Sequence, residues 1–585
     1  MPSGFSRACL ALAALAAAAA VSAAPTVMPA TGPDARPATG TARTILDLQP
    51  WCTTSSATVE GAGGQPGIAT LANLNPNVNA WYVLSVAWQG AAAPLEYHLE
   101  NPRADVPLTL ARAGPQAVRI AAADGSRACT LELAGPSGSL VAAARSGLPY
   151  APLCDGLLYL RNAVPGNRSS IERVTDFLRD HVWGGERIIA FAKEQIFRDA
   201  FLEKGELAAA PATPPPAGGP APATIDDAWV GRALVPEHLG IRVAGEPRAL
   251  LPGRWYPLPD LDGVYLSVLA AEAIPAHILL GHERSVNPLD PVESAALVYL
   301  VAFDLGRFDL HFTLGTDHPR LDWSDRPPAS VRDPALPGPD GIANEAPLVR
   351  NGIVSPAEVA RTLAAFTGGF KREHGAFRFG ELAGRNRGSH YGFVEQGTVF
   401  STLQPGLATV LVMNDGRVEL GTWSRADDAA LARVRFARQN GVPLIEFDPA
   451  RGVGVPGELV NLWGPGNWSG SAKEDARTLR AGLCLQQSDA GRFLVYGYFS
   501  SATPSAMTRI FQAYRCRYAM HLDMNALEHT YLALYLRRGQ QRLVEHLIEG
   551  MEVLDRDSGN GLAPRFIAFP DNRDFFFLTD KAPPP

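Results

Sequence analysis

Hydrophobic and polar residues alternate in short runs along the first part of the chain. Turn residues separate these runs, and the alternation has a period of two. Several short runs of this kind are typical of a β-sandwich. The predicted strands are Gly67–Leu74, Trp81–Trp88, Leu95–Leu99, Val106–Leu110, Ala117–Ala121, Cys129–Leu133 and Ser139–Ala143. We therefore predict an all-β sandwich over residues 46–155.

A helical pattern and a proline-rich segment follow the predicted sandwich. Ser169 and Glu172 have the spacing of a capping box, which predicts the first of two helices in a helical segment over residues 156–206. Residues 207–224 are rich in proline and alanine, a composition typical of a semi-rigid linker. Residues 225–295 then form either a small domain or the entry to the last domain.

Strand-like and helix-like patterns alternate from residue 296 onward. Apolar β-rich runs predict strands, and capping signals ahead of a helical period predict helices. The predicted strands are Leu297–Phe303, Asp309–Gly315, Ala408–Met413, Val418–Trp423, Leu444–Phe447, Ala481–Gln486 and Arg492–Phe499, and the predicted helices are Ser355–Phe366, Asp427–Gln439 and Ser505–Tyr514. This order predicts an α+β or mixed α/β domain with a mixed sheet over residues 296–580.

The stretch from Cys516 to Tyr531 carries the densest group of candidate functional residues. We predict a short buried strand, residues 518–522, that leads into a helix near residue 526. Because strand side chains alternate between faces, His521, Asp523 and Asn525 are expected to point the same way. A second interpretation treats Asn525 and Glu528 as a capping box with a structural role only.

The N-terminal composition indicates export. Residues 1–24 combine a sparse basic start, an apolar run and a small-residue end, the pattern of a cleaved signal peptide, and residues 25–45 resemble a disordered leader. No later run of about 18 apolar residues suggests a membrane span, so the mature protein is expected to be periplasmic or secreted, without membrane contact. The net charge of -7 argues against a nucleic-acid partner. The oligomeric state is left open.

The cysteine content fits an oxidising compartment. Cys9 lies in the predicted signal peptide, which leaves five cysteines in the mature chain. We expect a disulfide between Cys484 and Cys516 and one further pair among the other three.

Three sequence blocks within residues 296–580 share features with a known family. They are Thr367-Gly368-Gly369-Phe370, with the later hairpin turn Asp415-Gly416; an arginine, Arg477 or Arg480, ahead of the strand that begins at Gly482; and Ala519-Met-His-Leu-Asp-Met-Asn525. Residues 296–580 thereby resemble the phosphodiester glycosidase family, the domain of the enzyme that removes N-acetylglucosamine from mannose 6-phosphate diesters. The family has asparagine where this chain has Thr367, and Gly-Gly where it has Met524-Asn525.

The resemblance implies an exported hydrolase that cleaves the bond between a sugar's anomeric carbon and a phosphate oxygen. Its substrate is expected to be a carbohydrate or sugar phosphate, with no cofactor. A carboxylate stabilises oxocarbenium character, and arginine and backbone N–H groups bind the diester's charge. The implied roles are Asp523 as the carboxylate, His521 and Asn525 as supporting hydrogen-bond partners, Arg477 or Arg480 as phosphate ligand, Thr367, Gly368 and Gly369 as the close backbone approach, and Glu373 and His374 as further acid/base candidates.

Two other functions remain open from the sequence. One is a metal-dependent enzyme in which His521, Asp523 and His529 hold a divalent ion that activates water. The other is a non-catalytic exported protein that retains the fold and binds polysaccharide.

Overall fold

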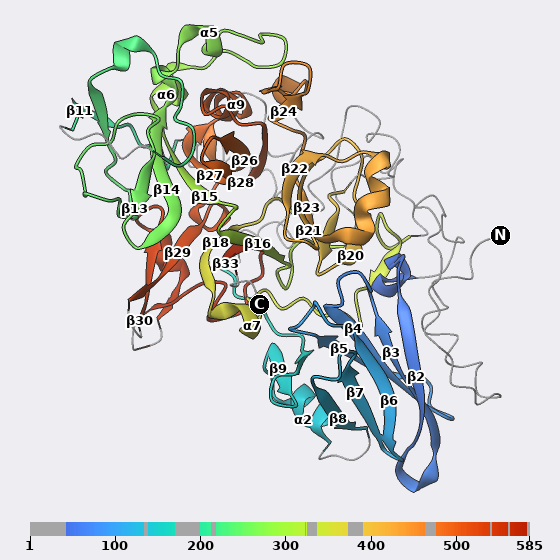
Figure 1. The fold of residues 1–585 in the computed structure, drawn as a ribbon. Coiled ribbons are helices and arrows are strands. Elements are labelled where there is room, and N and C mark those ends of the chain that lie inside the picture. Colours follow the sequence, from blue (N-terminus) through green and yellow to red (C-terminus); the bar gives the residue numbers. More distant parts are fainter. Residues whose placement is uncertain are drawn as a thin grey trace, which may run out of the picture.

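Antiparallel sheets make up most of the molecule, and short helices join their strands (Figure 1). The structure is a computed structural model. It describes residues 43–133, 138–169, 199–211, 218–321, 323, 336–371, 390–462, 476–538, 541–557, 559 and 562–581. The predicted signal peptide, both helices predicted around residues 170–198, and the candidates Glu373 and His374 lie outside these ranges. The α+β class predicted from the sequence is confirmed, with β-structure dominant.

The N-terminal strands, β2 to β10, form two facing sheets with one hydrophobic core between them. The larger sheet has the order β2 (Thr53–Glu60), β3 (Pro66–Asn73), β4 (Trp81–Trp88), β5 (Leu95–Glu100), β10 (Leu158–Arg161), β9 (Tyr150–Leu153). The smaller sheet contains β6 (Leu108–Gly114), β7 (Ala117–Ala122) and β8 (Ala128–Glu132). A disulfide links Cys129 in β8 to Cys154, directly after β9, with a Cα–Cα distance of 5.6 Å, so it joins the smaller sheet to the larger one.

The last strand predicted for this region is wrong. Residues Ser139–Arg145 form helix α2, and its buried side chains are Leu140 and Ala143. These two residues are three positions apart, which places them on one helical face, and the alanine-rich sequence favours a helix.

Three larger sheets form the rest of the molecule (Figure 1). The eight-stranded sheet has the order β13 (Tyr256–Leu258), β14 (Leu261–Ala270), β15 (Leu297–Asp304), β27 (Gly491–Ala502), β26 (Thr478–Ser488), β28 (Tyr518–Met524), β24 (Ile445–Asp448), β25 (Val453–Pro456). One five-stranded sheet runs β16 (Phe308–Thr313), β33 (Phe575–Asp580), β18 (Thr362–Thr367), β29 (Leu532–Arg538), β30 (Gln541–His546). The other runs β20 (Thr398–Ser401), β19 (Phe393–Glu395), β23 (Val434–Gln439), β21 (Ala408–Met413), β22 (Val418–Thr422).

Two of the predicted helices begin as expected but soon become strands. Helix α7 covers only Pro356–Val359 before β18 begins, and a 3-10 turn over Arg425–Arg433 precedes β23. The Ser355 side chain does not cap α7, because its hydroxyl donates to Glu100 instead. Every residue of β18 is buried between neighbouring strands. Sheet pairing and burial therefore override the helical start. The third predicted helix in this region is confirmed as α9, Pro504–Ala513.

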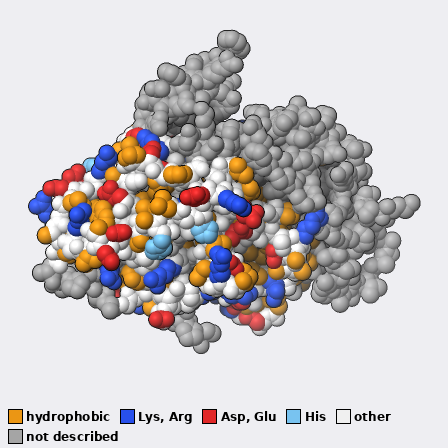
Figure 2. Space-filling model, turned by 90° about the horizontal axis from the view of Figure 1, so that it is seen from above, with side chains coloured by type: hydrophobic (Ala, Val, Ile, Leu, Met, Phe, Trp, Pro, Cys, Tyr) orange, Lys and Arg blue, Asp and Glu red, His pale blue; other side chains and the backbone are white. Residues whose placement is uncertain are grey.

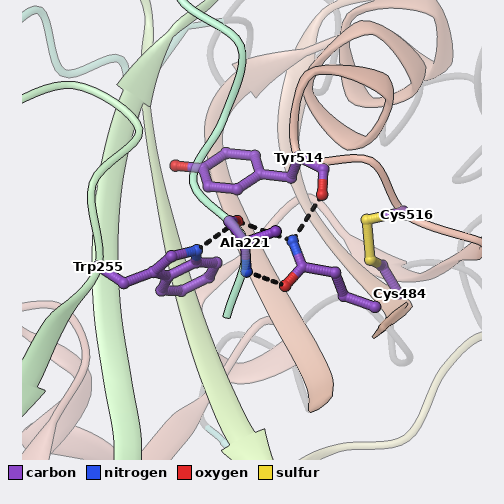
Figure 3. Close-up of a disulfide and its surroundings, with 6 residues drawn as sticks. Ala221, Trp255, Cys484, Tyr514 and Cys516 are labelled. Atoms are coloured by element: carbon purple, nitrogen blue, oxygen red, sulfur yellow. Dashed lines mark hydrogen bonds between the residues drawn. A yellow bond between two sulfur atoms is a disulfide. The ribbon is translucent and has the colours of Figure 1, made fainter. Parts of the chain in front are cut away.

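Both described ends of the predicted linker are bound to the rest of the molecule. Strand β11 (Glu206–Ala209) pairs with β12 (Arg232–Val235). Farther along, Ala221 N donates to the side chain of Gln486 at 2.9 Å, and Ala221 O accepts from Trp255 Nε1 at 2.8 Å (Figure 3). Residues 43–45, at the end of the predicted leader, belong to the fold, because β1 (Arg43–Thr44) pairs with β17 (Ile342–Asn344) and Ile45 is buried.

The predicted disulfide between Cys484 and Cys516 is confirmed, with a Cα–Cα distance of 5.9 Å (Figure 3). It joins β26 to the segment between α9 and β28. Next to it, the Gln486 amide donates to Tyr514 O at 2.5 Å. The chain leading into β28 is therefore fixed at its start by a covalent bond and a buried amide.

A buried group of charged residues joins the first sheets to the later ones. Arg161 donates to the Glu100 carboxylate and to Tyr150 Oη, and it lies 3.9 Å from the carboxylate of Glu395. The Arg161 guanidinium also stacks over the ring of Trp81 at 4.4 Å. On the other side of the junction, the Ser355 hydroxyl donates to Glu100. These polar contacts connect the first sheets to the start of α7 and to β19.

Charged side chains are mixed on the face shown in Figure 2. Basic and acidic residues alternate there with hydrophobic ones, without a large area of one sign among the described residues on that face. No helix in the described part of the chain is long and apolar enough to cross a membrane.

Candidate functional site

Strand β28 places Asp523 beside an arginine that is distant in the sequence. The side chain of Asp523 is only 8% exposed, and Arg573 Nη1 donates to its Oδ2 at 3.1 Å. The Met524 N–H donates to Oδ1 at 2.8 Å. Burial raises the pKa of the Asp523 carboxyl, while the charges of His529 and Arg573 oppose that shift.

The double-glycine turn lies next to the residue that follows this arginine. Strand β18 ends at Thr367, and the Gly368 N–H donates to Asp574 O at 2.8 Å. A Cβ atom on Gly368 would lie 2.5 Å from Asp574 Oδ2, and one on Gly369 would lie 2.9 Å from Asn440 Oδ1. Neither glycine has a positive φ. The sequence predicted that a ligand approaches these glycines closely. In the structure, the side chains of Asp574 and Asn440 lie close to them.

A second buried ion pair fixes this turn from the neighbouring sheet. Arg438, fully buried in β23, donates through Nε to Asp574 Oδ2 at 2.7 Å and through Nη2 to Phe370 O. The Asp574 carboxylate thus compensates the charge of Arg438 while its carbonyl holds Gly368.

Asn440 connects the turn to β28. Its Oδ1 accepts from the Phe370 N–H at 2.9 Å, and its Nδ2 donates to His521 O at 2.7 Å and to Leu522 O at 2.6 Å. One side chain therefore bridges the backbone of the double-glycine turn and that of the strand carrying Asp523.

His521 lies beneath the turn and is fully buried. Its ring stacks on Phe370 with centroids 4.8 Å apart, and its Nε2 lies 3.2 Å from Arg480 Nη1. Burial and the charge of Arg480 hold the pKa of His521 well below its usual value. The ring is therefore neutral, and its Nε2 accepts a hydrogen bond from the arginine.

The two arginines predicted as phosphate ligands have other partners. Arg477 forms ion pairs with Asp199, at 2.8 Å, and with Asp290, and these contacts account for its position outside the Asp523 group. Arg480 is fully buried and donates to Ala502 O at 2.7 Å as well as to His521. The arginine that pairs with Asp523 is instead Arg573.

The residues after β28 do not cap a helix, so the capping-box interpretation is wrong. Ala526 is the N-cap of a 3-10 turn, Leu527–His529, and a strand follows. Asn525 takes φ +81 and accepts from the Thr478 hydroxyl at 3.1 Å. Asparagine tolerates this left-handed conformation better than most residues.

Glu528, within this 3-10 turn, and Thr367, at the end of β18, are both buried. Burial alone would raise the pKa of Glu528, but hydrogen bonding to His529 and the charges of His529 and Arg573 lower it to about 2. Thr367 Oγ1 donates to Glu528 O at 3.3 Å, so the residue directly before the double-glycine turn contacts the 3-10 turn.

The sequence analysis missed Arg573, Asp574, Arg438 and Asn440. Two signals could have revealed them: charged residues directly before the aromatic strand Phe575–Asp580, and polar residues at the end of the strand Val434–Gln439. Both patterns place polar groups at the end of a buried strand, the same observation that pointed to Asp523.

The metal interpretation finds no support in the described residues. No group of three or more His, Cys, Asp or Glu side chains in these ranges is placed to hold a metal ion. His529 Nδ1 faces Met524 O at 2.7 Å, and His521 faces Arg480, so neither ring is directed at Asp523 as a joint ligand.

Comparisons with known proteins leave the family undefined. No protein-family model matches the chain, and neither does any curated protein. Among solved structures, the "Putative exported protein" of Burkholderia pseudomallei K96243 is 10% identical, with a TM-score of 0.22, over 48% of this chain and 74% of that one. A hypothetical protein from Synechocystis is 11% identical, with a TM-score of 0.24, over 86% of this chain and 97% of that one.

Proposed function

We propose that the chain is an exported hydrolase that cleaves sugar 1-phosphodiesters, with Asp523 as the carboxylate at the anomeric carbon. The proposal rests on one observation: Arg573 pairs with Asp523, and the adjacent Asp574 contacts the Gly368-Gly369 turn. Arg573 and Asp523 are 50 positions apart, and they bring an anion-binding group and a carboxylate together. The Cys129–Cys154 and Cys484–Cys516 disulfides fit a protein that matures in an oxidising compartment.

The chemistry of the substrate suits this pair. A phosphate leaving group is weakly basic, so the reaction depends on stabilising positive charge at the anomeric carbon and negative charge on the phosphate. A carboxylate supplies the first, and a planar guanidinium supplies the second through paired hydrogen bonds. Arg573 takes the phosphate-binding role that the sequence assigned to Arg477 or Arg480.

The surrounding residues hold this pair in place. Asn440 ties β28 to the double-glycine turn, and Arg438 ties that turn to Asp574. Burial raises the pKa of Asp523 above that of an exposed aspartate, a perturbation common at functional sites. His521 has a positioning role, because its ring is enclosed by Phe370 and Arg480.

A second candidate function is polysaccharide binding without catalysis. The observation that favours it is the low exposure of Asp523, both of whose carboxylate oxygens have hydrogen-bond donors within the protein. In that case the ion pair with Arg573 is structural, and the fold alone is retained.

The test offers purified protein a series of chromogenic sugar 1-phosphodiesters. Asp523→Asn and Arg573→Gln are each expected to lower kcat/KM by about 10²-fold or more. Asp262→Asn and Arg451→Gln serve as matched controls, because both side chains are mainly exposed. Thermal unfolding of every variant separates loss of chemistry from loss of fold.

Three outcomes distinguish the candidate functions. Turnover that survives in folded Asp523→Asn removes this residue from catalysis. Turnover that is lost only with a chelator assigns the reaction to a metal. Retained glycan binding without any turnover in the natural sequence supports the binding protein.

A further inference from the structure

A hollow of about 420 Å³ lies between two sheets, away from Asp523. Its walls come from β22, from the hairpin of β26 and β27, and from the segment where β28 begins. Tyr518 lines it at the start of β28, whereas Asp523 is near the end of the same strand, which separates the two by roughly 17 Å of extended chain. The volume lies within the range of small-ligand sites.

Two arginines in this hollow have no carboxylate partner within the part of the chain that the structure describes. Arg517 lies over the ring of Phe447, with its guanidinium carbon 4.0 Å from the ring centroid. Arg492 donates through Nη2 to the backbone carbonyl of Val418 at 2.6 Å. Both guanidinium groups line the cavity, and neither charge is neutralised by a neighbour.

The carboxylates nearest to the hollow are already engaged. Glu419 lines it, but its carboxylate accepts from Arg417 Nη1 at 3.0 Å. Glu446, next to Phe447, accepts from the Thr422 hydroxyl at 2.7 Å. Glu446 keeps its negative charge near Tyr518, but it forms no ion pair with either arginine. Arg492 and Arg517 therefore line the cavity without a paired carboxylate among the described residues.

The remaining wall suits a sugar ring. The ring of Phe447 is 37% exposed, and the apolar side chains of Leu420 and Leu485 also line the cavity. The exposed amide of Gln487 adds hydrogen-bonding capacity beside these apolar surfaces. A saccharide presents both apolar C–H faces and hydroxyl groups, so this mixture of surfaces matches its chemistry.

We propose that this hollow binds a saccharide that carries a negative charge, a carboxylate or a phosphate, through Arg492 and Arg517. Stacking on Phe447 holds the Arg517 guanidinium flat and leaves its N–H edge for paired hydrogen bonds to anionic oxygens. The site is separate from Asp523, and its binding does not depend on whether Asp523 is catalytic.

The experiment measures binding to the full chain by titration calorimetry. The carboxylate probe is trigalacturonate, with its neutral methyl ester as the matched control. The phosphate probe is galactose 6-phosphate, with galactose and inorganic phosphate as controls. The variants are Arg517→Gln, whose side chain is exposed, and the double variant with Arg492→Gln, with Arg451→Gln as an exposed arginine control.

The expected result is binding of at least one charged probe that weakens as salt is added. The Kd should rise about tenfold or more in the double variant, less in Arg517→Gln, and stay unchanged in Arg451→Gln. Binding of trigalacturonate alone identifies uronates as the ligand class, and binding of galactose 6-phosphate alone identifies phosphorylated sugars.

Four results would overturn the proposal. These are the absence of binding by both charged probes at millimolar concentration, equal binding of the methyl ester, equal binding of inorganic phosphate and galactose 6-phosphate, and an unchanged Kd in both arginine variants. Thermal unfolding confirms that each variant is folded, and Arg517→Gln keeps the test valid if the double variant is unstable.

Discussion

The buried carboxyl of Glu395 makes the stability of the fold depend on pH. Burial raises the pKa of Glu395 to about 8, because the charge of Arg161 and the hydrogen bond from the Leu314 N–H offset the loss of water only in part. The Leu314 N–H lies 3.2 Å from Oε2, and Arg161 lies 3.9 Å from Oε1. Glu395 is therefore mainly protonated in the folded protein near neutral pH.

The direction of the effect follows from proton binding. In the unfolded chain Glu395 loses its proton near pH 4.5, whereas the folded chain retains it until about pH 8. Between these values the folded state holds more protons, so stability falls as pH rises, by at most about 1.4 kcal/mol per pH unit from this group. Glu395→Gln resembles the protonated side chain and removes this loss.

Urea unfolding across that pH window tests the prediction. The difference in the free energy of unfolding, Glu395→Gln minus the natural sequence, should increase with pH and level off above about pH 8. Glu132→Gln, at an exposed position, is the matched control and should run parallel to the natural sequence. Parallel curves for Glu395→Gln as well would refute the reasoning.

Three other substitutions test contacts that hold the fold together. Arg161→Met leaves Glu100 buried without its ion-pair partner and is expected to cost about 3–5 kcal/mol in the free energy of unfolding, and a loss below about 1 kcal/mol would contradict this. Gly368→Ala places a Cβ 2.5 Å from Asp574 Oδ2 and should destabilise by about 1–3 kcal/mol, while Gly421→Ala, where space is open, is the control. Replacing Cys484 and Cys516 together by serine should lower stability by about 2–4 kcal/mol in denaturant unfolding, and reducing agent should then have less effect on the variant than on the natural sequence.

Local patterns in the sequence predicted most of the strands but not the lengths of the helices. The hairpin of β21 and β22 follows directly from alternation on both sides of a turn at Asn414-Asp415-Gly416. The start at Ser355 is also a local signal, yet the residues after it pair with strands from residues 532–534 and 575–579. Such distant pairing has no signature within a short window of sequence, and it converts the expected helix into β18.

The candidate site shows the same limit. A polar residue at the end of a buried strand pointed to Asp523, and the paired glycines pointed to residues 368 and 369. Their actual neighbours, Arg573, Asp574 and Asn440, lie next to the ends of other strands, and only the folded chain brings them together. The sequence therefore predicted groups that need partners, without identifying those partners. The catalytic roles remain predictions.

Strand β33 also affects the order in which the molecule can form. It lies between β16 and β18, so the five-stranded sheet stays divided until Phe575–Asp580 is available. The two residues directly before it provide the partner of Asp523 and the acceptor for Gly368. Because a ribosome makes these residues after all their partners, an emerging chain carries Asp523 for some time without its arginine. The candidate site is therefore complete only after residues 573 and 574 have been made, and any chain released before residue 573 would lack it.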